Sequence, residues 1–123
     1  LIDLGILDCT LEAAMGEDLN GETRRYFMHG TSHSLGLDVH DVGVTRPNGE
    51  GPGRILEPGM VLTVEPGLYF PLWTGEGSAP EKYLGIGIRI EDDILITDGE
   101  PEVLTKHCPK TVEDIEAVIG AGA

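Results

Sequence analysis

The side chains best suited to chemistry lie in three separate segments of this 123-residue chain. Three of its four histidines, His29, His33 and His40, fall within twelve positions of one another. Glu65 and Glu91 each stand in a later segment that is apolar and strand-like. A charge among apolar neighbours is costly unless it is paired or bound to a metal. We therefore expect His33, Glu65 and Glu91 to converge on a divalent cation.

The residue types alone are compatible with more than one role for these side chains. Glu91 could form an ordinary buried ion pair with Arg89, which precedes it by two positions. His29 and His40 could each be a core or surface histidine with a satisfied hydrogen bond, and we assign no role to His107. Hard divalent ions prefer oxygen ligands, and an imidazole extends the range toward manganese, cobalt and zinc. One histidine with two glutamates is therefore a credible part of a metal site.

Two strands are predicted to carry the carboxylates. The β-branched and aromatic residues of segments 60–70 and 86–97 are typical of strands. Pro66 is expected to interrupt the first strand directly after Glu65, because proline cannot donate a backbone hydrogen bond. Glu91 lies in the middle of the second strand.

The side chains beside the two acids are expected to be buried. Alternation along the first strand places Thr63 and Glu65 on one face. Val64 and Ile90 are apolar neighbours of the acids, and we expect both to lie in the core. This expected burial is the reason for reading the acids as more than solvated surface groups.

Other segments are predicted from periodicity and turn residues. Apolar residues spaced by three or four predict helix over 1–14, with Thr10 capping a short second helix. The other predicted elements are loops over 15–25, 42–58 and 71–83, short strands over 36–40 and 103–104, and a helix over 112–119 that Thr111 caps.

Length and charge bound the class of protein. The length predicts one domain, and 18 glycines with 8 prolines predict many turns. A formal net charge of -14 argues against nucleic acid or an anionic membrane as a partner, since both attract basic patches. Cys9 and Cys108 are expected to be free thiols, and we expect a cytoplasmic protein. Because the chain begins at Leu1 within an apolar segment, we expect residues to precede it.

Taken together, three motifs resemble the aminopeptidase P and prolidase family, the metallopeptidase group with the pita-bread fold. They match in order and are highly specific. The resemblance runs from about Tyr26 to Ile119 and is carried by residues 29–41 (HGTSHSLGLDVHD), 56–67 (LEPGMVLTVEPG) and 87–93 (GIRIEDD).

The resemblance implies an α+β fold. Residues 1–123 would be the C-terminal portion of a metallopeptidase catalytic domain, the C-terminal half of a pita-bread (creatinase/aminopeptidase-like) fold with a curved antiparallel sheet flanked by helices. It further implies an aminopeptidase that releases the N-terminal residue of peptides with proline at the second position, through a metal-bridged hydroxide. A prolidase that cleaves Xaa-Pro dipeptides and a non-catalytic binding relative are the alternatives.

The implied cofactor is a pair of divalent ions, with manganese expected and cobalt or zinc as alternatives. By the resemblance, His33 and Glu65 would bind one ion, and Glu91 would bridge both. The family uses five protein ligands, and two of them are aspartates on an earlier strand that this chain does not match. We therefore expect weak or absent metal binding and no useful hydrolysis from this chain alone.

The resemblance also implies roles around the metals. His29 and His40 would line the site of the proline-containing peptide and stabilise the developing oxyanion. Arg89 would order the carboxylates, and Glu65 would relay a proton to the leaving amine. The exposed sheet of an incomplete domain leads us to expect a homo-oligomer.

Overall fold

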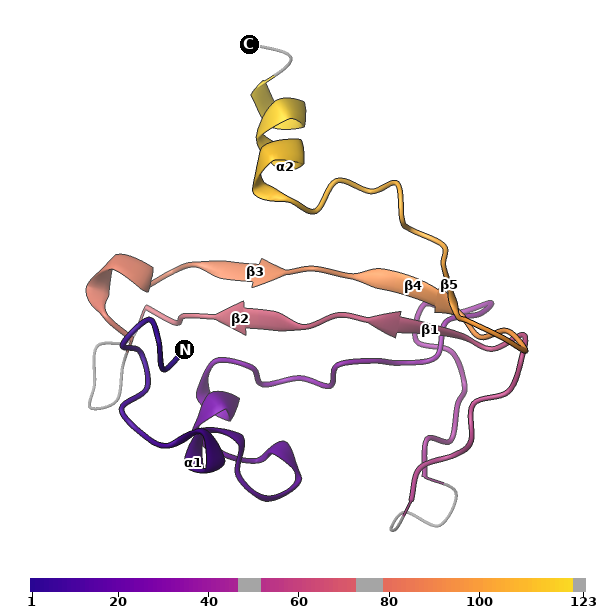
Figure 1. Ribbon diagram of the computed structural model, residues 1–123, viewed down its shortest axis with the longest axis horizontal. Helices are drawn as coiled ribbons and strands as arrows, with labels where there is room; N and C mark the ends of the chain where they lie inside the picture. Colours follow the sequence, from indigo (N-terminus) through magenta and orange to yellow (C-terminus); the bar gives the residue numbers. More distant parts are fainter. Residues whose placement is uncertain (47–51, 73–78, 121–123) are drawn as a thin grey trace. The chain divides into compact units, whose positions relative to one another are not determined.

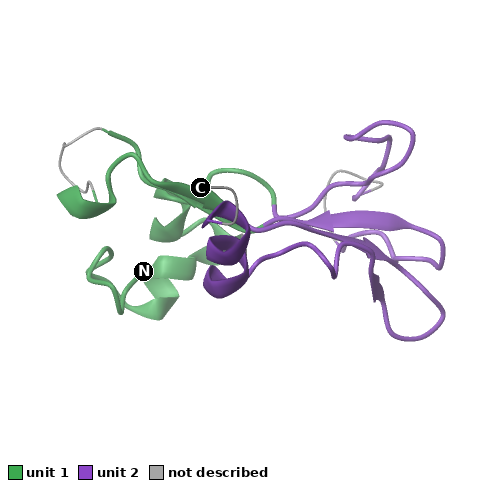
Figure 2. Cartoon of the chain, turned by 90° about the horizontal axis from the view of Figure 1, so that it is seen from above, with its two compact units in different colours: residues 1–30, 66–89 green, residues 31–65, 90–123 purple. Residues whose placement is uncertain are grey.

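The computed structural model describes residues 1–46, 52–72 and 79–120, so parts of the predicted loops 42–58 and 71–83 lie outside the described residues. The chain divides into two units, each built from two stretches of sequence (Figure 2). Unit 1 comprises Leu1–Gly30 and Pro66–Arg89, and unit 2 comprises Thr31–Glu65 and Ile90–Ala123. Each unit contains its own antiparallel sheet (Figure 1).

The sheet of unit 2 contains the strands β1 (Val61–Val64), β4 (Asp92–Leu95) and β5 (Glu102–Val103). They are antiparallel neighbours in the order β1-β4-β5. The register places Val61 opposite Leu95 and Val64 opposite Asp92. The predicted return strand over 103–104 is thus confirmed, one residue earlier than expected.

A further segment, residues 31–35, runs antiparallel along the free side of β1. Ser34 forms a bridge with Leu62 at its centre. Three backbone N–H groups donate across this pair: Glu65 to Thr31 at 2.8 Å, Thr63 to His33 at 3.0 Å and Leu35 to Val61 at 3.0 Å. The histidine segment is therefore fixed against β1 by main-chain hydrogen bonds, which set the position of each of its residues.

The strand predicted over 36–40 is wrong, because these residues form successive bends. The Gly36 N–H donates to the Asp38 carbonyl at 3.2 Å, and the Asp41 N–H donates back to the Ser34 carbonyl at 3.0 Å. Leu37 and Val39, the apolar half of the alternation, are both exposed. Alternation predicts a strand only where a sheet edge is available, and residues 31–35 already pair with that side of β1.

The predicted strands 60–70 and 86–97 are confirmed, each in two pieces. After β1 the chain passes through Glu65 and Pro66 into β2 (Gly67–Tyr69), and the predicted interruption at the proline is present. In the second stretch, β3 (Gly87–Arg89) is separated from β4 by residues 90–91. Strands β2 and β3 pair antiparallel and form the sheet of unit 1.

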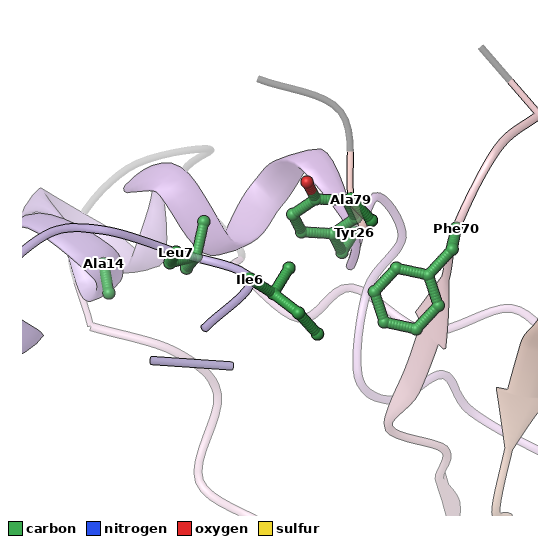
Figure 3. Close-up of a cluster of buried hydrophobic side chains, with 6 residues drawn as sticks. All are labelled: Ile6, Leu7, Ala14, Tyr26, Phe70 and Ala79. Atoms are coloured by element: carbon green, nitrogen blue, oxygen red, sulfur yellow. The ribbon is translucent and has the colours of Figure 1, made fainter. Parts of the chain in front are cut away.

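The apolar core that the structure describes lies in unit 1. Tyr26 is fully buried, and its ring lies 5.2 Å from that of Phe70 between centroids (Figure 3). The ring of Tyr83 lies 5.6 Å from that of Phe70. The buried members of the cluster are Ile6, Leu7, Ala14, Tyr26, Phe70 and Ala79.

The predicted helix over 1–14 is wrong for its first part. Only α1 (Leu11–Met15) is helical, and Gly5 adopts a φ of 65°, which breaks the helical path. The Thr10 cap is confirmed, since its hydroxyl accepts from the Ala13 N–H at 3.2 Å. Helical spacing in 1–14 instead reflects turns that bury Ile6 and Leu7.

The remaining helices are short. The predicted helix over 112–119 is confirmed as α2 (Val112–Ile119), and the Thr111 hydroxyl accepts from the Asp114 N–H at 3.1 Å. The predicted loop over 15–25 contains two short 3-10 helices, η1 (Glu17–Leu19) and η2 (Glu22–Arg25), and the predicted loop over 71–83 contains η3 (Glu81–Tyr83).

Candidate metal centre

The pairing of β1 with β4 brings Glu65 and Glu91 to the same place. Val64 lies opposite Asp92, so the next pair in this register is Glu65 with Glu91. Residues directly opposite in an antiparallel pair share a face of the sheet. On the other side of β1, the Ser34–Leu62 bridge places His33 opposite Thr63, on the same face as Glu65. All three predicted ligands therefore point from one face.

The structure brings the three side chains together. One ligand atom each of His33, Glu65 and Glu91 lies within 4.8 Å of the others. Glu65 is 6% exposed, whereas His33 is half-buried and Glu91 is exposed. The convergence expected from the sequence is present, and the binding of a metal there stays a prediction.

The orientation of the His33 ring fits a cation. Its Nδ1 lies 3.0 Å from the Ser34 carbonyl oxygen, which can only accept, so Nδ1 carries the hydrogen. In the neutral imidazole, Nε2 then presents a lone pair to Glu65 Oε1 at 3.2 Å. Two lone pairs at this distance repel unless a proton or a metal ion lies between them. One imidazole nitrogen with two carboxylates is also a donor set that manganese, cobalt and zinc accept.

Thr63 joins two of these residues and was not among the predicted site residues. Its hydroxyl donates to Glu65 Oε1 at 3.1 Å and accepts from the backbone N–H of His33 at 3.0 Å. The side chain is 1% exposed. The sequence did hold a signal, since Thr63 lies two positions before the acid on the same face of the predicted strand.

His40 lies beside His33 in unit 2. The two imidazole rings are perpendicular, with centroids 4.4 Å apart. His40 is exposed to solvent. The structure therefore places a second imidazole next to the candidate ligands, and its contact with substrate stays a prediction.

His29 and Arg89 belong to unit 1, where both contact Tyr69. The Nδ1 of His29 lies 2.6 Å from the Gly30 carbonyl oxygen, so in the neutral ring Nε2 accepts from the Tyr69 hydroxyl at 2.8 Å. Arg89 Nε donates to the same phenolic oxygen at 2.6 Å. Tyr69 was also missing from the predicted residues, although it follows Glu65 by only four positions.

The neighbours of the acids are not buried as predicted. Val64 is 43% exposed and Ile90 is 46% exposed in the described structure. Val64 lies on the face of β1 opposite to Glu65, and that face is only partly covered by described residues. The expectation that these apolar neighbours are buried was wrong, although Glu65 itself is buried and contacts His33 and Thr63.

The opposite face of β4 carries a second polar cluster around Asp92. The Thr105 hydroxyl donates to Asp92 Oδ1 at 2.6 Å, and Lys110 Nζ lies 3.0 Å from the same oxygen. Lys110 also donates to the carbonyls of Thr105 and Cys108. The Thr105 hydrogen bond, followed by that of Lys110, lowers the pKa of the Asp92 carboxyl.

Comparison with known proteins places this geometry in a family. Residues 4–98 match the model of metallopeptidase family M24. The chain belongs to this family. It is 52% identical over 121 residues to an Xaa-Pro aminopeptidase of Escherichia coli strain K12, and 44% identical over 119 residues to Xaa-Pro aminopeptidase 3 of Rattus norvegicus. The first comparison covers 98% of this chain and 25% of the bacterial enzyme.

Solved structures of the M24 family agree with the fold. A structure of E. coli aminopeptidase P with the inhibitor Pro-Leu matches 98% of this chain at 51% identity, with a TM-score of 0.81. A zinc-substituted form of that enzyme in complex with product gives a TM-score of 0.83 at 50% identity. This chain covers 26% of either structure. The predicted α+β class and the antiparallel, pita-bread type of sheet are thereby confirmed.

The cysteines and the helix lengths complete the description of this M24 chain. Cys9 and Cys108 are both free thiols, as predicted. Among the residues that the structure describes, no helix is both long and apolar enough to span a bilayer.

Proposed function

We propose that this chain forms the C-terminal portion of the catalytic domain of an Xaa-Pro aminopeptidase. In this proposal, His33, Glu65 and Glu91 contribute three ligands to a pair of divalent ions, with manganese as the expected metal. The observation that carries the proposal is the convergence of one ligand atom each from His33, Glu65 and Glu91 within 4.8 Å, with His33 Nε2 at 3.2 Å from Glu65 Oε1. The likeness to the E. coli Xaa-Pro aminopeptidase supports the reaction class.

Each side chain near the proposed metal site would have a separate role in hydrolysis. Divalent ions bound there would lower the pKa of a water molecule and polarise the peptide carbonyl. Glu65 would accept a proton from the attacking water and pass it to the leaving amine. His40, beside His33, would donate to the oxyanion that develops on the carbonyl.

His29 and Arg89 would act through their contacts with Tyr69. The Tyr69 hydroxyl accepts from Arg89 and donates to His29, so it fixes the tautomer of the His29 ring with Nδ1 protonated. A histidine of defined tautomer offers a peptide substrate one defined hydrogen-bonding group. We propose that His29 contacts the peptide and that Arg89 orders the carboxylates.

A chimaera tests the proposal. The segment of the E. coli Xaa-Pro aminopeptidase that matches this chain is replaced by residues 1–123, and hydrolysis is measured with Mn²⁺ on a longer Xaa-Pro peptide and on an Xaa-Pro dipeptide. Cleavage of the longer peptide, lost in a Glu65→Gln chimaera, supports the aminopeptidase. Cleavage of the dipeptide alone would favour a prolidase. A folded chimaera that binds peptide without cleaving either substrate would favour a non-catalytic relative.

The isolated chain should be a poor enzyme. Its three candidate ligands leave the two implied aspartates unmatched, so we expect weak or absent Mn²⁺ binding and no useful turnover. Incubation of the 123-residue chain with Mn²⁺ and an Xaa-Pro peptide tests this expectation. A turnover number on the order of 1 per second, as in ordinary enzymes, would contradict it.

The proposal includes self-association and a cytoplasmic location. Large apolar side chains are exposed in both units, and a contiguous apolar surface drives association in water. Light scattering of the isolated chain should show species larger than a monomer, and a clean monomer would contradict this part. The two free thiols suit a reducing compartment.

A further inference from the structure

Thr63 occupies a connecting position in the candidate metal centre. Its hydroxyl has one hydrogen, which points to Glu65 Oε1 at 3.1 Å. The same hydroxyl oxygen accepts from the backbone N–H of His33 at 3.0 Å. One buried hydroxyl thus links the main chain of one candidate ligand to the carboxylate of another.

The backbone around Thr63 makes this link rigid. The Thr63 N–H donates to the His33 carbonyl at 3.0 Å, so the two residues exchange two hydrogen bonds, one through the main chain and one through the hydroxyl. A β-branched side chain has few χ1 choices on a strand. At 1% exposure, the hydroxyl has no competing contact with bulk water. Its direction toward Glu65 is therefore set by the sheet.

We infer that Thr63 is a positioning residue of the metal centre, which holds the Glu65 carboxylate at a fixed angle and distance from His33. The inference rests on the proposed function. Hydrogen-bond partners that orient metal ligands commonly contribute about 10- to 100-fold to metal affinity. Removal of the Thr63 hydroxyl leaves Glu65 able to rotate about its side-chain bonds, so the carboxylate is no longer pre-organised for a cation.

Cobalt binding tests the inference without catalysis. Co²⁺ is titrated into the metal-free form of the chimaera described above, because the isolated chain is expected to bind metal weakly or not at all. The visible absorption of the bound Co²⁺ reports both affinity and coordination geometry. We expect Thr63→Val to lower the affinity about 10- to 100-fold and to change the spectrum. Thr63→Ser, which retains the hydroxyl, should restore both. Thr31→Val, an exposed threonine on the segment paired with β1, is the matched control and should bind as the wild type does.

Several outcomes would overturn the inference. Wild-type affinity and spectrum in a folded Thr63→Val variant would do so, as would failure of Thr63→Ser to restore them. Circular dichroism establishes folding. If Thr63→Val does not fold, Thr63→Ala replaces it, because alanine also lacks the hydroxyl and adds no metal ligand. Wild-type affinity in a folded Thr63→Ala variant would then count against the inference.

A reference variant and the chimaera separate this inference from the proposed function. If Glu65→Gln binds Co²⁺ as the wild type does, no site exists at Glu65 and both ideas fail. If the wild-type chimaera and its Thr63→Val variant are equally active, the proposed function stands and the inference fails. If the chimaera is inactive but cobalt affinity depends on the Thr63 hydroxyl, the inference stands and the aminopeptidase assignment fails.

Discussion

Replacement of Glu91 by glutamine should have opposite effects on stability without and with metal. The ligand atoms of Glu65 and Glu91 lie within 4.8 Å of one another. Two like charges at that distance repel by about 3.5 kcal/mol at an effective dielectric constant of ~20, and by about 0.9 kcal/mol at ~80. Because Glu91 is exposed to solvent, the lower value applies. Glu91→Gln should therefore stabilise the metal-free chain by about 1 kcal/mol.

Bound metal should reverse the sign of the stability change that Glu91→Gln causes. A ligand that binds only the folded state at about 100 times its dissociation constant adds about 2.7 kcal/mol of stability. The chimaera supplies the rest of the catalytic domain, so its wild type should gain stability as Mn²⁺ is raised. Its Glu91→Gln variant should gain little, since a neutral amide is a poorer ligand for a hard cation. The order of the two proteins in stability should therefore invert between the metal-free state and saturating metal.

Urea denaturation followed by circular dichroism, with a chelator or with Mn²⁺, measures both effects. With a urea slope of about 1–3 kcal/mol per M, a change of about 1 kcal/mol moves the midpoint by roughly 0.3–1 M. Glu102→Gln is the control, because it removes one exposed charge from β5 of the same sheet and corrects for the general repulsion in a chain of net charge -14. A metal-free Glu91→Gln no more stable than this control would refute close approach of the two carboxylates.

Three further predictions concern the framework around the site. Tyr26→Ala should lower the free energy of unfolding by about 3–5 kcal/mol in urea denaturation, because the Tyr26 side chain is fully buried against Phe70. Tyr83 is only half-buried, so Tyr83→Ala should lower it clearly less, and equal losses would contradict the assigned core. Lys110→Met should raise the pKa of Asp92 part of the way to its ordinary value. The ammonium group's hydrogen bond and charge are lost, while the Thr105 hydrogen bond remains. An unchanged pKa of Asp92 in an NMR titration would show that the ion pair is not formed. Thr111→Ala should destabilise α2 by about 1 kcal/mol and reduce its helicity, because it removes the N-terminal cap. Unaltered hydrogen exchange of the α2 amides would contradict this prediction.

The sequence predicts the candidate ligands better than it predicts how they meet. His33, Glu65 and Glu91 could be chosen from residue type and motif, and the strands near the two acids follow from β-branched residues. Their convergence depends on the register of β1 against β4, which is a long-range pairing between segments about thirty residues apart. Local alternation indicates which residues share a face of one strand, but not which strand lies beside it, and no short turn fixes the register between these two segments.

The failures have related causes. The alternation over 36–40 predicted a strand because local pattern does not reveal whether a sheet edge is available. The helical spacing over 1–14 is weakened by Gly5, and in the structure the positive φ of this glycine makes a turn that ends the helical path. Thr63 was overlooked because threonine is common on strands, and its importance depends on two neighbours that only the folded chain supplies.

The acidic run makes the length of Glu91, rather than its charge, specific to the register of β4. Glu91, Asp92 and Asp93 are consecutive acids, so they project to alternate faces of the sheet. A slip of one residue that brought Asp92 opposite Glu65 would still present a carboxylate beside His33, but on a side chain one methylene shorter. The same slip would bring Asp93 to the place of Asp92, so Lys110 would again meet a carboxylate. The extra methylene of Glu91 therefore distinguishes the two registers at the candidate metal centre.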